Sequence, residues 1–363
     1  MNDFPIVQFV KRHRLRLAAS CAALLTAAAV FIFFMVSPAG DGGSLHLIDC
    51  PKGAPLYRVA MDMESRGIIR SARIFVWLAR IKGDDGKVQA GTYQLNNALS
   101  PGEILRKMVA GEVYAVRFAV PEGYSIHQVA ELLDGKKIYS KADFLAACSN
   151  RDLLQDLKIP GPTVEGYLHP STYSIPPQMK PEECIRMMVA QFERVNAELF
   201  AQLPSKGGLT RHQVVTLASL VEKEAVDARE RPLIASVFFN RLKKGMRLQS
   251  DPTAVYGVRA FGGSVSREDL QRRTPYNTYL IDGLPPGAIG NPSSAALQAV
   301  LSPSSTPYFY FVAKKDGTHF FSATLDQHNR AVTTYLKGAA VRTHSTQSRA
   351  EYRNDNPSLT GGR

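Results

Sequence analysis

Two carboxylates, Glu222 and Glu224, are the residues of this sequence best suited to acid–base chemistry. They lie near the end of a predicted helix whose other residues are mostly apolar or small, and they border the face that should be buried. Burial raises the pKa of a carboxyl group, and a raised pKa suits a group that donates protons near neutral pH. The pattern therefore predicts a proton donor in this helix.

Periodicity places the two acids on the helix. Thr210, followed three residues later by Gln213, forms a capping box that predicts where the helix begins. Apolar residues then recur at helical spacing, and at about 100° per residue Glu222 and Glu224 lie on opposite edges of their stripe. Glu222 follows one turn after the small residues 218–219, which leave room for a ligand. It is therefore the better candidate for an acid in a cleft.

Irregular segments on both sides of this helix contain further polar candidates. Glu165 lies in a Pro-rich stretch beside aromatic residues. In sugar-binding sites, aromatic rings stack on the sugar and an acid binds its hydroxyl groups, so this stretch is a candidate sugar-binding segment. The loop TPYNTYLIDGLPPGAIGNP is too long for a simple connector, and such loops are usually functional.

Each candidate acid also has a structural alternative. The two helix acids would end the helix and form ion pairs with Arg229 or Arg231, which the spacing alone favours. Glu165 would belong to a loop that packs on the core through its tyrosines. Asp251 would cap the next helix.

A mostly apolar run from Leu17 to Val36, uninterrupted by any charged residue, predicts a membrane anchor. At ~1.5 Å per residue it reaches across a ~30 Å hydrocarbon core. Four basic residues directly precede the run and none follows until Lys52, so the positive-inside rule leaves residues 1–16 in the cytoplasm and exports the rest. A cleaved signal peptide is the main alternative, but the run is longer than a typical signal-peptide core.

Composition narrows the class of protein. The net charge of +12 is spread along the chain, and in an exported protein it suits an anionic polymer or anionic lipid headgroups rather than nucleic acid. The cysteines are too few and too scattered for a disulfide framework, although one bridge is left open. The sequence contains no zinc-binding, phosphate-binding, dinucleotide-binding or serine-nucleophile motif, so neither a metal nor a cofactor is expected.

An internal repeat organises the first exported part. Segments 48–75 and 118–145 align without gaps, so that Pro51 matches Pro121 and Gly53 matches Gly123. Each copy predicts a strand, a Pro-x-Gly turn and an amphipathic helix. With a further strand and a helix that Gly111 ends, the first unit is a predicted strand–helix–helix–strand–helix module. It resembles a LysM-like module, a class associated with glycan chains; a plain spacer is the alternative.

Elements beyond the acid-bearing helix are predicted from turn and capping residues. They are, in chain order, a helix opened by Asp227 and closed by Gly245, a short strand in MRLQSDPT that runs into a turn at Asp251-Pro252, a hairpin from Tyr308 to Phe321 about Asp316-Gly317, and a helix from Leu325 to Leu336 capped by Thr324.

Five segments together resemble the MltG (YceG-like) family of endolytic murein transglycosylases, over about residues 44–336. They are EGYLHPSTY from Glu165, ASLVEKEA from Ala218, SVFFNRLKKGMRLQSDPTAVYG from Ser236, YNTYLIDGLPPGAIGNP from Tyr276 and PYFYFVAKKDGTHFFSATLDQHN from Pro307. The run Tyr167-Leu168-His169 departs from the more aromatic run that often follows the Glu-Gly pair in this family, which affects the shape of the cleft.

The resemblance implies an α+β fold in three parts and a disordered tail. These are a single N-terminal transmembrane helix at 17–36 after a basic cytoplasmic segment at 1–16, a LysM-like small α/β module at 44–113, a mixed α+β YceG-type catalytic domain at 114–337 and the tail at 338–363. It also implies a single-pass inner-membrane enzyme whose catalytic domain is periplasmic. The implied partners are peptidoglycan glycan strands, the inner membrane and peptidoglycan synthases.

The resemblance also implies a mechanism. Glu222, the first acid of VEKE, matches the family's catalytic glutamate. It would protonate the glycosidic oxygen between N-acetylmuramic acid and N-acetylglucosamine, then take the proton of the muramyl 6-hydroxyl, which leaves a 1,6-anhydro end and terminates elongation. The candidate lining residues are Glu165, Ser219, Gln249, Asp251 and Asn277.

Two other functions are compatible with the sequence. One is a two-carboxylate muramidase, in which Glu165 or Asp251 would act beside Glu222 and the products would carry reducing ends. The other is a non-catalytic scaffold that binds peptidoglycan.

Overall fold

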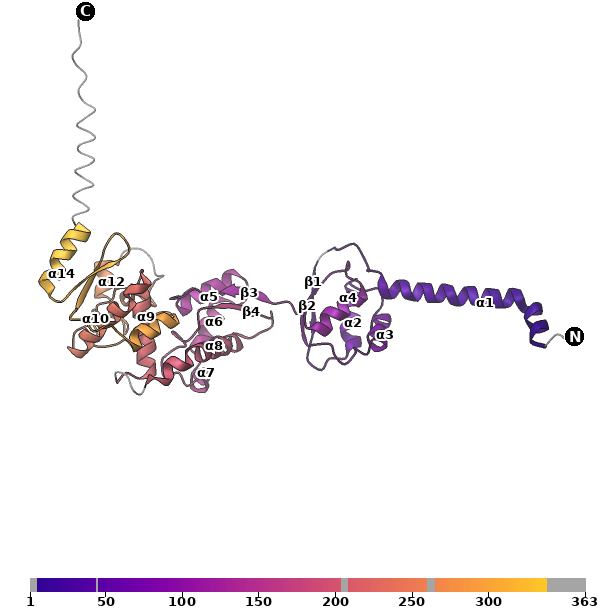
Figure 1. Ribbon diagram of the computed structural model, residues 1–363, viewed down its shortest axis with the longest axis horizontal. Helices are drawn as coiled ribbons and strands as arrows, with labels where there is room; N and C mark the ends of the chain where they lie inside the picture. Colours follow the sequence, from indigo (N-terminus) through magenta and orange to yellow (C-terminus); the bar gives the residue numbers. More distant parts are fainter. Residues whose placement is uncertain (1–4, 44, 204–207, 260–264, 338–363) are drawn as a thin grey trace, which may run out of the picture. The chain divides into compact units, whose positions relative to one another are not determined.

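A computed structural model describes residues 5–43, 45–203, 208–259 and 265–337 (Figure 1). The described chain is a mixed α+β protein with three two-stranded sheets, and it divides into two compact units. Unit 1 comprises Met1–Arg117 with Ser174–Gln178, and unit 2 comprises Phe118–Tyr173 with Met179–Arg363. The tail from Gly338, predicted to be disordered, lies outside the described residues.

Unit 1 confirms the predicted strand–helix–helix–strand–helix order. Its elements are α1 (Pro5–Val36), β1 (His46–Cys50), α2 (Leu56–Ser65), α3 (Ala72–Ile81), β2 (Gly91–Leu95) and α4 (Pro101–Ala110). β1 pairs antiparallel with β2, so that Ile48 faces Tyr93, and both side chains are fully buried. Helix α4 begins at a capping box formed by Ser100, and Gly111 ends it in the left-handed conformation, as its position in the sequence predicts.

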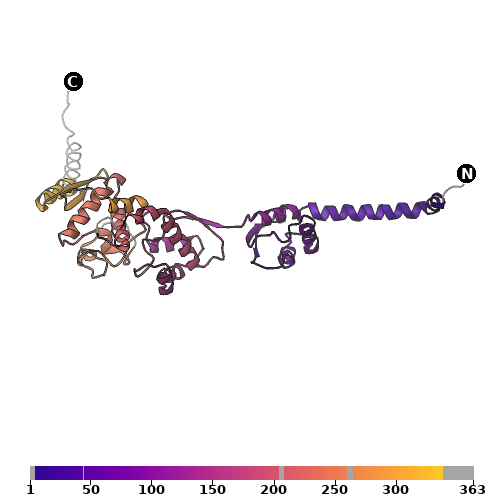
Figure 2. The ribbon, with the colours of Figure 1, turned by 60° about the horizontal axis from the view of Figure 1, so that its bottom comes forward.

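Helix α1 of unit 1 is a long rod in both ribbon views (Figures 1 and 2). Its side chains are described at Arg16 and at residues 18–34. Over the described part of the chain, no helix is both long enough and apolar enough to cross a membrane.

Unit 2 is mainly helical. The strands β3 (Val116–Ala119) and β4 (Thr172–Ile175) each have two residues in unit 2 and two in unit 1. The other elements of unit 2 are α5 (Ile126–Gly135), α6 (Lys141–Cys148), α7 (Arg151–Asp156), α8 (Pro181–Ala201), α9 (Arg211–Glu224), a 3-10 turn (Ala228–Glu230), α10 (Arg231–Lys243), α11 (Asp251–Val255), α12 (Arg267–Gln271), α13 (Ser294–Leu301), β5 (Tyr310–Ala313), β6 (His319–Ser322), α14 (Leu325–Val332) and a π turn (Thr333–Lys337). β3 pairs with β4, and β5 pairs with β6 as the predicted hairpin. Helix α9 packs against α10, α11 and α13, and is therefore the central helix of this unit.

The strand predicted in MRLQSDPT is wrong. Gln249 has a φ of 50°, which interrupts an extended backbone, and its N–H donates to the carbonyl of Thr278. The N–H of Ser250 donates to the Thr278 hydroxyl, and Asp251 then begins the short helix α11 instead of a turn. The backbone of residues 249–251 is therefore set by hydrogen bonds to the loop around Thr278. Such contacts cannot be read from a local sequence pattern.

Candidate active site

Both predicted acids lie where the central helix reaches the surface of unit 2. Thr210 and Gln213 form the predicted capping box at the start of α9. Every residue from Val214 to Val221 is buried, because neighbouring helices surround this part of α9. The first turn and the last turn, which carries Glu222 and Glu224, are only partly buried. The structure thus places these carboxyl groups at the edge of a fully packed core.

Glu222 is held by three hydrogen-bond donors. Its side chain is 7% exposed, and one oxygen accepts from Nη2 of Arg231 at 2.9 Å. The other oxygen accepts from the backbone N–H of Ser293 at 3.0 Å and from the Ser293 hydroxyl. Glu222 therefore borders the buried stripe, as the sequence predicts, but its carboxyl group is held by polar donors, and the ion pair with Arg231, which was the structural alternative, is present. Charge-assisted bonds of this kind fix the orientation of a carboxylate.

Cationic side chains surround this carboxyl group. Lys223 is half-buried, and burial lowers the pKa of its ammonium group to about 8 against the opposing charges of Glu165 and Glu222. Nη2 of Arg231 also lies 3.8 Å from Glu122. Glu222 is thus placed between an arginine and a lysine, with one further acid nearby.

The buried amide of Asn291 joins the loops that enclose Glu222. Its backbone carbonyl accepts from the N–H of Gly123, and its own N–H donates to the carbonyl of Tyr124, both at 2.8 Å. Its side-chain oxygen accepts from the N–H groups of Gly166 and Leu168 at 3.0 and 2.9 Å. Through its backbone and its side chain, Asn291 thus connects the loops around residues 123, 166 and 291.

Glu165 lies in the interior of this loop assembly, not on an exposed wall. Its two oxygens accept from the N–H of Ile126, the first residue of α5, at 3.1 and 2.9 Å. The hydroxyl of Tyr256 donates to it at 2.8 Å, and the amide of Asn291 lies 3.3 Å away. A carboxylate at this position satisfies a free N–H at a helix N-terminus. Burial nevertheless dominates and raises the pKa of Glu165 to about 7.

Two other predicted lining residues are also buried. The Ser219 hydroxyl donates to the carbonyl of Thr216 at 2.7 Å and accepts from the N–H of Ile289 at 3.0 Å. The Asn277 amide nitrogen, in a fully buried side chain, donates to three backbone carbonyls. Both side chains therefore hold the long irregular loop in place.

The remaining two candidates, Gln249 and Asp251, are exposed and lie beside Glu224. Ser250 between them donates from its hydroxyl to Glu224 at 2.6 Å, and Asp251 accepts from the hydroxyl of Tyr279. Burial raises the pKa of Glu224 to about 7, opposed by the Ser250 hydrogen bond and reinforced by the charge of Asp251. The two acids of VEKE thus have different partners.

The sequence did not identify Asn291 and Ser293 individually, and it assigned Arg231 only a structural role. The irregular loop GAIGNPS, which contains Asn291 and Ser293, was the feature of the sequence that could have pointed to them.

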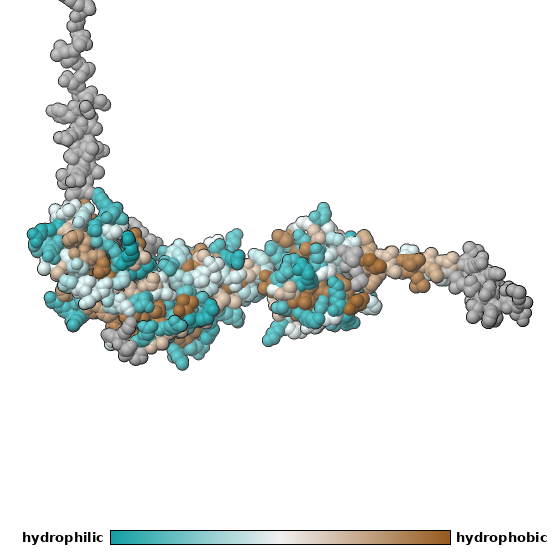
Figure 3. Space-filling view, in the orientation of Figure 1, coloured by the Kyte–Doolittle hydropathy of each residue, from teal (hydrophilic) through white to brown (hydrophobic). Residues whose placement is uncertain are grey.

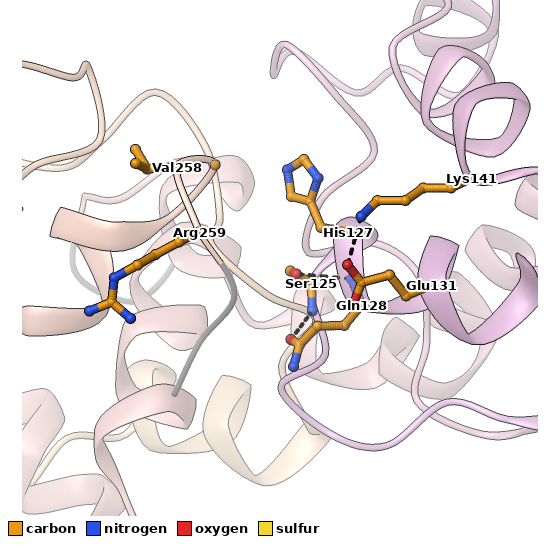
Figure 4. A pocket seen from close by; sticks show the side chains of 8 residues that line it. Ser125, His127, Gln128, Glu131, Lys141, Val258 and Arg259 are labelled. Atoms are coloured by element: carbon orange, nitrogen blue, oxygen red, sulfur yellow. Dashed lines mark hydrogen bonds and ion pairs between the residues drawn. The ribbon is translucent and has the colours of Figure 1, made fainter. Parts of the chain in front are cut away.

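A separate polar cavity of about 160 Å³ lies beside α5 (Figure 4). Figure 4 shows Glu131 and Lys141 directed towards each other in its wall, where they form an ion pair.

Comparisons with known proteins agree on one family. The model of the YceG-like family matches residues 48–334. An endolytic murein transglycosylase from Bacillus subtilis (strain 168) is 34% identical over 305 residues, which cover 80% of this chain and 84% of that protein. An endolytic murein transglycosylase from Streptococcus pneumoniae (strain D39) is 29% identical over 321 residues, which cover 80% of this chain and 58% of that protein. A crystal structure of a yceG-like protein from Listeria monocytogenes has a TM-score of 0.56 and 32% identity, and the match covers 79% of this chain and 99% of that one.

Replacing Gly166 by Ala should destabilise unit 2 by about 2–4 kcal/mol. Gly166 has a φ of 89°, and a Cβ there would lie 2.6 Å from Cβ of Ala288 and 2.7 Å from Cγ1 of Val215. Chemical denaturation measures the loss. Gly135→Ala is the control, because nothing lies within 4 Å of its added Cβ in helix α5. Equal stabilities for the two variants would contradict this packing.

The buried carboxyl of Glu224 should make unit 2 less stable as pH rises. The folded protein keeps this proton up to about pH 7, whereas the unfolded chain releases it near its ordinary pKa of 4.5. The stabilising contribution is therefore complete below 4.5 and is lost as pH rises through 7. Glu224→Gln keeps an acceptor for Ser250 but cannot ionise. Between about pH 5 and about pH 8, its free energy of unfolding should rise relative to the parent protein by up to about 3 kcal/mol.

The measurement is urea unfolding of both proteins across this pH range. Glu198→Gln, an exposed position on α8, serves as the control. A constant difference between Glu224→Gln and the parent protein would show that Glu224 is not a buried titrating group.

Proposed function

Because this chain belongs to the YceG-like family, we propose that it is an endolytic murein transglycosylase, a lyase that cleaves peptidoglycan strands internally. The observation that carries the catalytic assignment is the setting of Glu222. This carboxyl group ends the central helix, is almost enclosed, and is held by donors from two separate segments.

Glu222 acts as the single acid and base of the reaction. In its protonated form it gives its proton to the glycosidic oxygen between N-acetylmuramic acid and N-acetylglucosamine as the bond to the muramyl anomeric carbon breaks. The muramyl 6-hydroxyl then attacks that carbon and returns its proton to the carboxylate. The product carries a 1,6-anhydro end, no water is consumed, and the enzyme regains its starting protonation state.

The neighbours of Glu222 suit both halves of this cycle. Arg231 and the Ser293 N–H hold the carboxylate for the base step, because both groups can only donate hydrogen bonds here. The Ser293 hydroxyl can either donate or accept, so it adapts when the carboxyl group carries the proton. Positioning of this kind adds to the ~10²–10⁴-fold that acid–base catalysis contributes.

The surroundings of Glu165 favour this mechanism over a two-carboxylate hydrolase. A second catalytic carboxylate must face the sugar or a water molecule beside it. Glu165 is 2% exposed, and its oxygens already accept from Ile126 and Tyr256. Asp251 is exposed but is grouped with Glu224, not with Glu222.

We further propose that residues 17–36 anchor the enzyme in the inner membrane and that residues 44–113 form a LysM-like module that binds glycan. The apolar run and its basic N-terminal flank support the anchor, with the catalytic unit on the periplasmic side. Anchoring would place cleavage close to the membrane, where peptidoglycan synthases extend new strands. The enzyme would then terminate the elongation of those strands.

Glu222→Gln should lower glycan cleavage by at least about a hundredfold, because it removes the proton donor and leaves the size of the side chain unchanged. Glu224→Gln is the matched control and should retain clearly more activity. Cleavage is measured by mass spectrometry of digested strands, and folding by thermal unfolding. Equal losses in two folded variants would contradict the assignment to Glu222 alone.

Removing residues 1–36 and exporting the rest as a soluble protein should preserve cleavage in the test tube but alter strand lengths in cells. The physical reason is that the anchor fixes the distance from the membrane at which strands are cut. Chromatography of cell-wall glycan measures this distribution. If the soluble form reproduced the parent distribution, the anchor would serve only for targeting.

A further inference from the structure

Helix α3 of unit 1 exposes a face that is both apolar and basic. Arg73, Trp77, Arg80 and Ile81 recur at the spacing of one helix face. Trp77 is 56% exposed and Ile81 is 59% exposed, whereas the other face of α3 packs into the core. Single exposed apolar residues are ordinary, but an exposed tryptophan and isoleucine that share a helix face with two arginines are typical of a membrane-surface helix.

This face is continuous with the apolar surface of α1. The rings of Phe31 and Trp77 meet edge to face with their centroids 5.8 Å apart. The guanidinium of Arg70 lies 4.6 Å from the ring centre of Phe33 and 5.7 Å from that of Phe34. Figure 1 shows α3 beside the end of α1, and Figure 3 shows hydrophobic surface where the two meet.

Hydrogen bonds also fix the connection between α1 and the module. The Asn97 side-chain oxygen accepts from the N–H groups of Gly42 and Gly43 at 3.0 and 3.1 Å. The Asn97 carbonyl accepts from the N–H of Gly40 at 2.8 Å. The module is therefore tied to the end of α1, which sets the depth of α3 relative to that helix.

The depth of Trp77 in the membrane follows from the geometry of helix α1. Phe31 precedes the end of α1 at Val36 by roughly 8 Å along the helix axis, at ~1.5 Å per residue. If residues 17–36 of α1 span the hydrocarbon core, Trp77 lies within roughly 8 Å of the boundary between acyl chains and headgroups. Tryptophan is enriched at this level, and arginines there attract anionic headgroups.

We propose that the α3 face formed by Arg73, Trp77, Arg80 and Ile81 lies in the headgroup layer of the membrane that α1 enters. Trp77 and Ile81 contact the upper acyl chains, and the arginines contact the phosphates of anionic phospholipids. The inference rests on the proposed anchoring by α1. It means that the module is fixed against the membrane surface and does not move freely above it.

The sequence offers a direct probe, because Trp77 is the only tryptophan. The full-length protein is reconstituted into vesicles of phosphatidylcholine and phosphatidylglycerol, and its tryptophan fluorescence is recorded. We expect strong quenching by lipids brominated near the headgroup, weaker quenching by lipids brominated near the methyl end, and little quenching by iodide in the water.

Two outcomes would overturn the inference. Full quenching by iodide would place Trp77 in water. Protection from iodide without quenching by either brominated lipid would mean that another protein or a second copy covers this face. Flotation of the vesicles tests the anchor separately, and cleavage of soluble glycan by the same sample tests the proposed enzyme activity.

A charge-reversal pair tests the role of the arginines. Each arginine near an anionic surface favours contact by about fivefold. Arg73→Glu with Arg80→Glu should therefore remove the increase in shallow-lipid quenching that phosphatidylglycerol causes in the parent protein. Arg151→Glu, an exposed position on α7 of unit 2, is the control and should leave that increase unchanged. Quenching of the double variant equal to that of the parent would contradict a headgroup contact.

Discussion

The hydrogen bonds of one fully buried amide, that of Asn291, are the interaction on which the rest of the site depends. Its oxygen accepts from two backbone N–H groups, and its nitrogen donates to the carbonyl of Tyr124 and lies within reach of Glu165. Losing it would leave several buried groups unsatisfied, at about 1–3 kcal/mol each. Ser293, which donates twice to Glu222, is only two residues further along the same loop. The position of the Glu222 carboxyl group, the proposed acid and base, is therefore fixed by a polar network at the edge of an otherwise apolar core.

The acids of unit 2 differ in role because they differ in partners. Glu165 completes a helix N-terminus in the interior, and Glu224 accepts from Ser250 beside an exposed loop. Of these three acids, Glu222 is the one that combines an arginine, a backbone donor and an adaptable hydroxyl near the end of a buried helix. A single acid–base residue needs such a setting, because the same group must both release and regain a proton within one cycle.

Local sequence patterns predicted the elements well and their polar contacts poorly. Capping boxes, turn residues and periodicity gave α4, α9 and the β5–β6 hairpin, because these signals act within a few residues. The burial of Glu165, Ser219 and Asn277 was missed, since their partners come from distant segments. The Ser293 donors to Glu222 were missed for the same reason, because several helices and loops separate the two residues along the chain. The candidate acid itself was found because its position at the end of a buried stripe is a local property.

Isotopic labelling of water can show whether water takes part in the cleavage. In the proposed reaction, Glu222 gives its proton to the leaving sugar and regains one from the muramyl 6-hydroxyl, without the use of water. Purified strands are digested in water enriched in oxygen-18, and the new ends are analysed by mass spectrometry. We expect 1,6-anhydro ends without the heavy isotope. Reducing ends that contain oxygen-18 would show that water attacks the anomeric carbon, and would contradict the single-carboxylate transglycosylase.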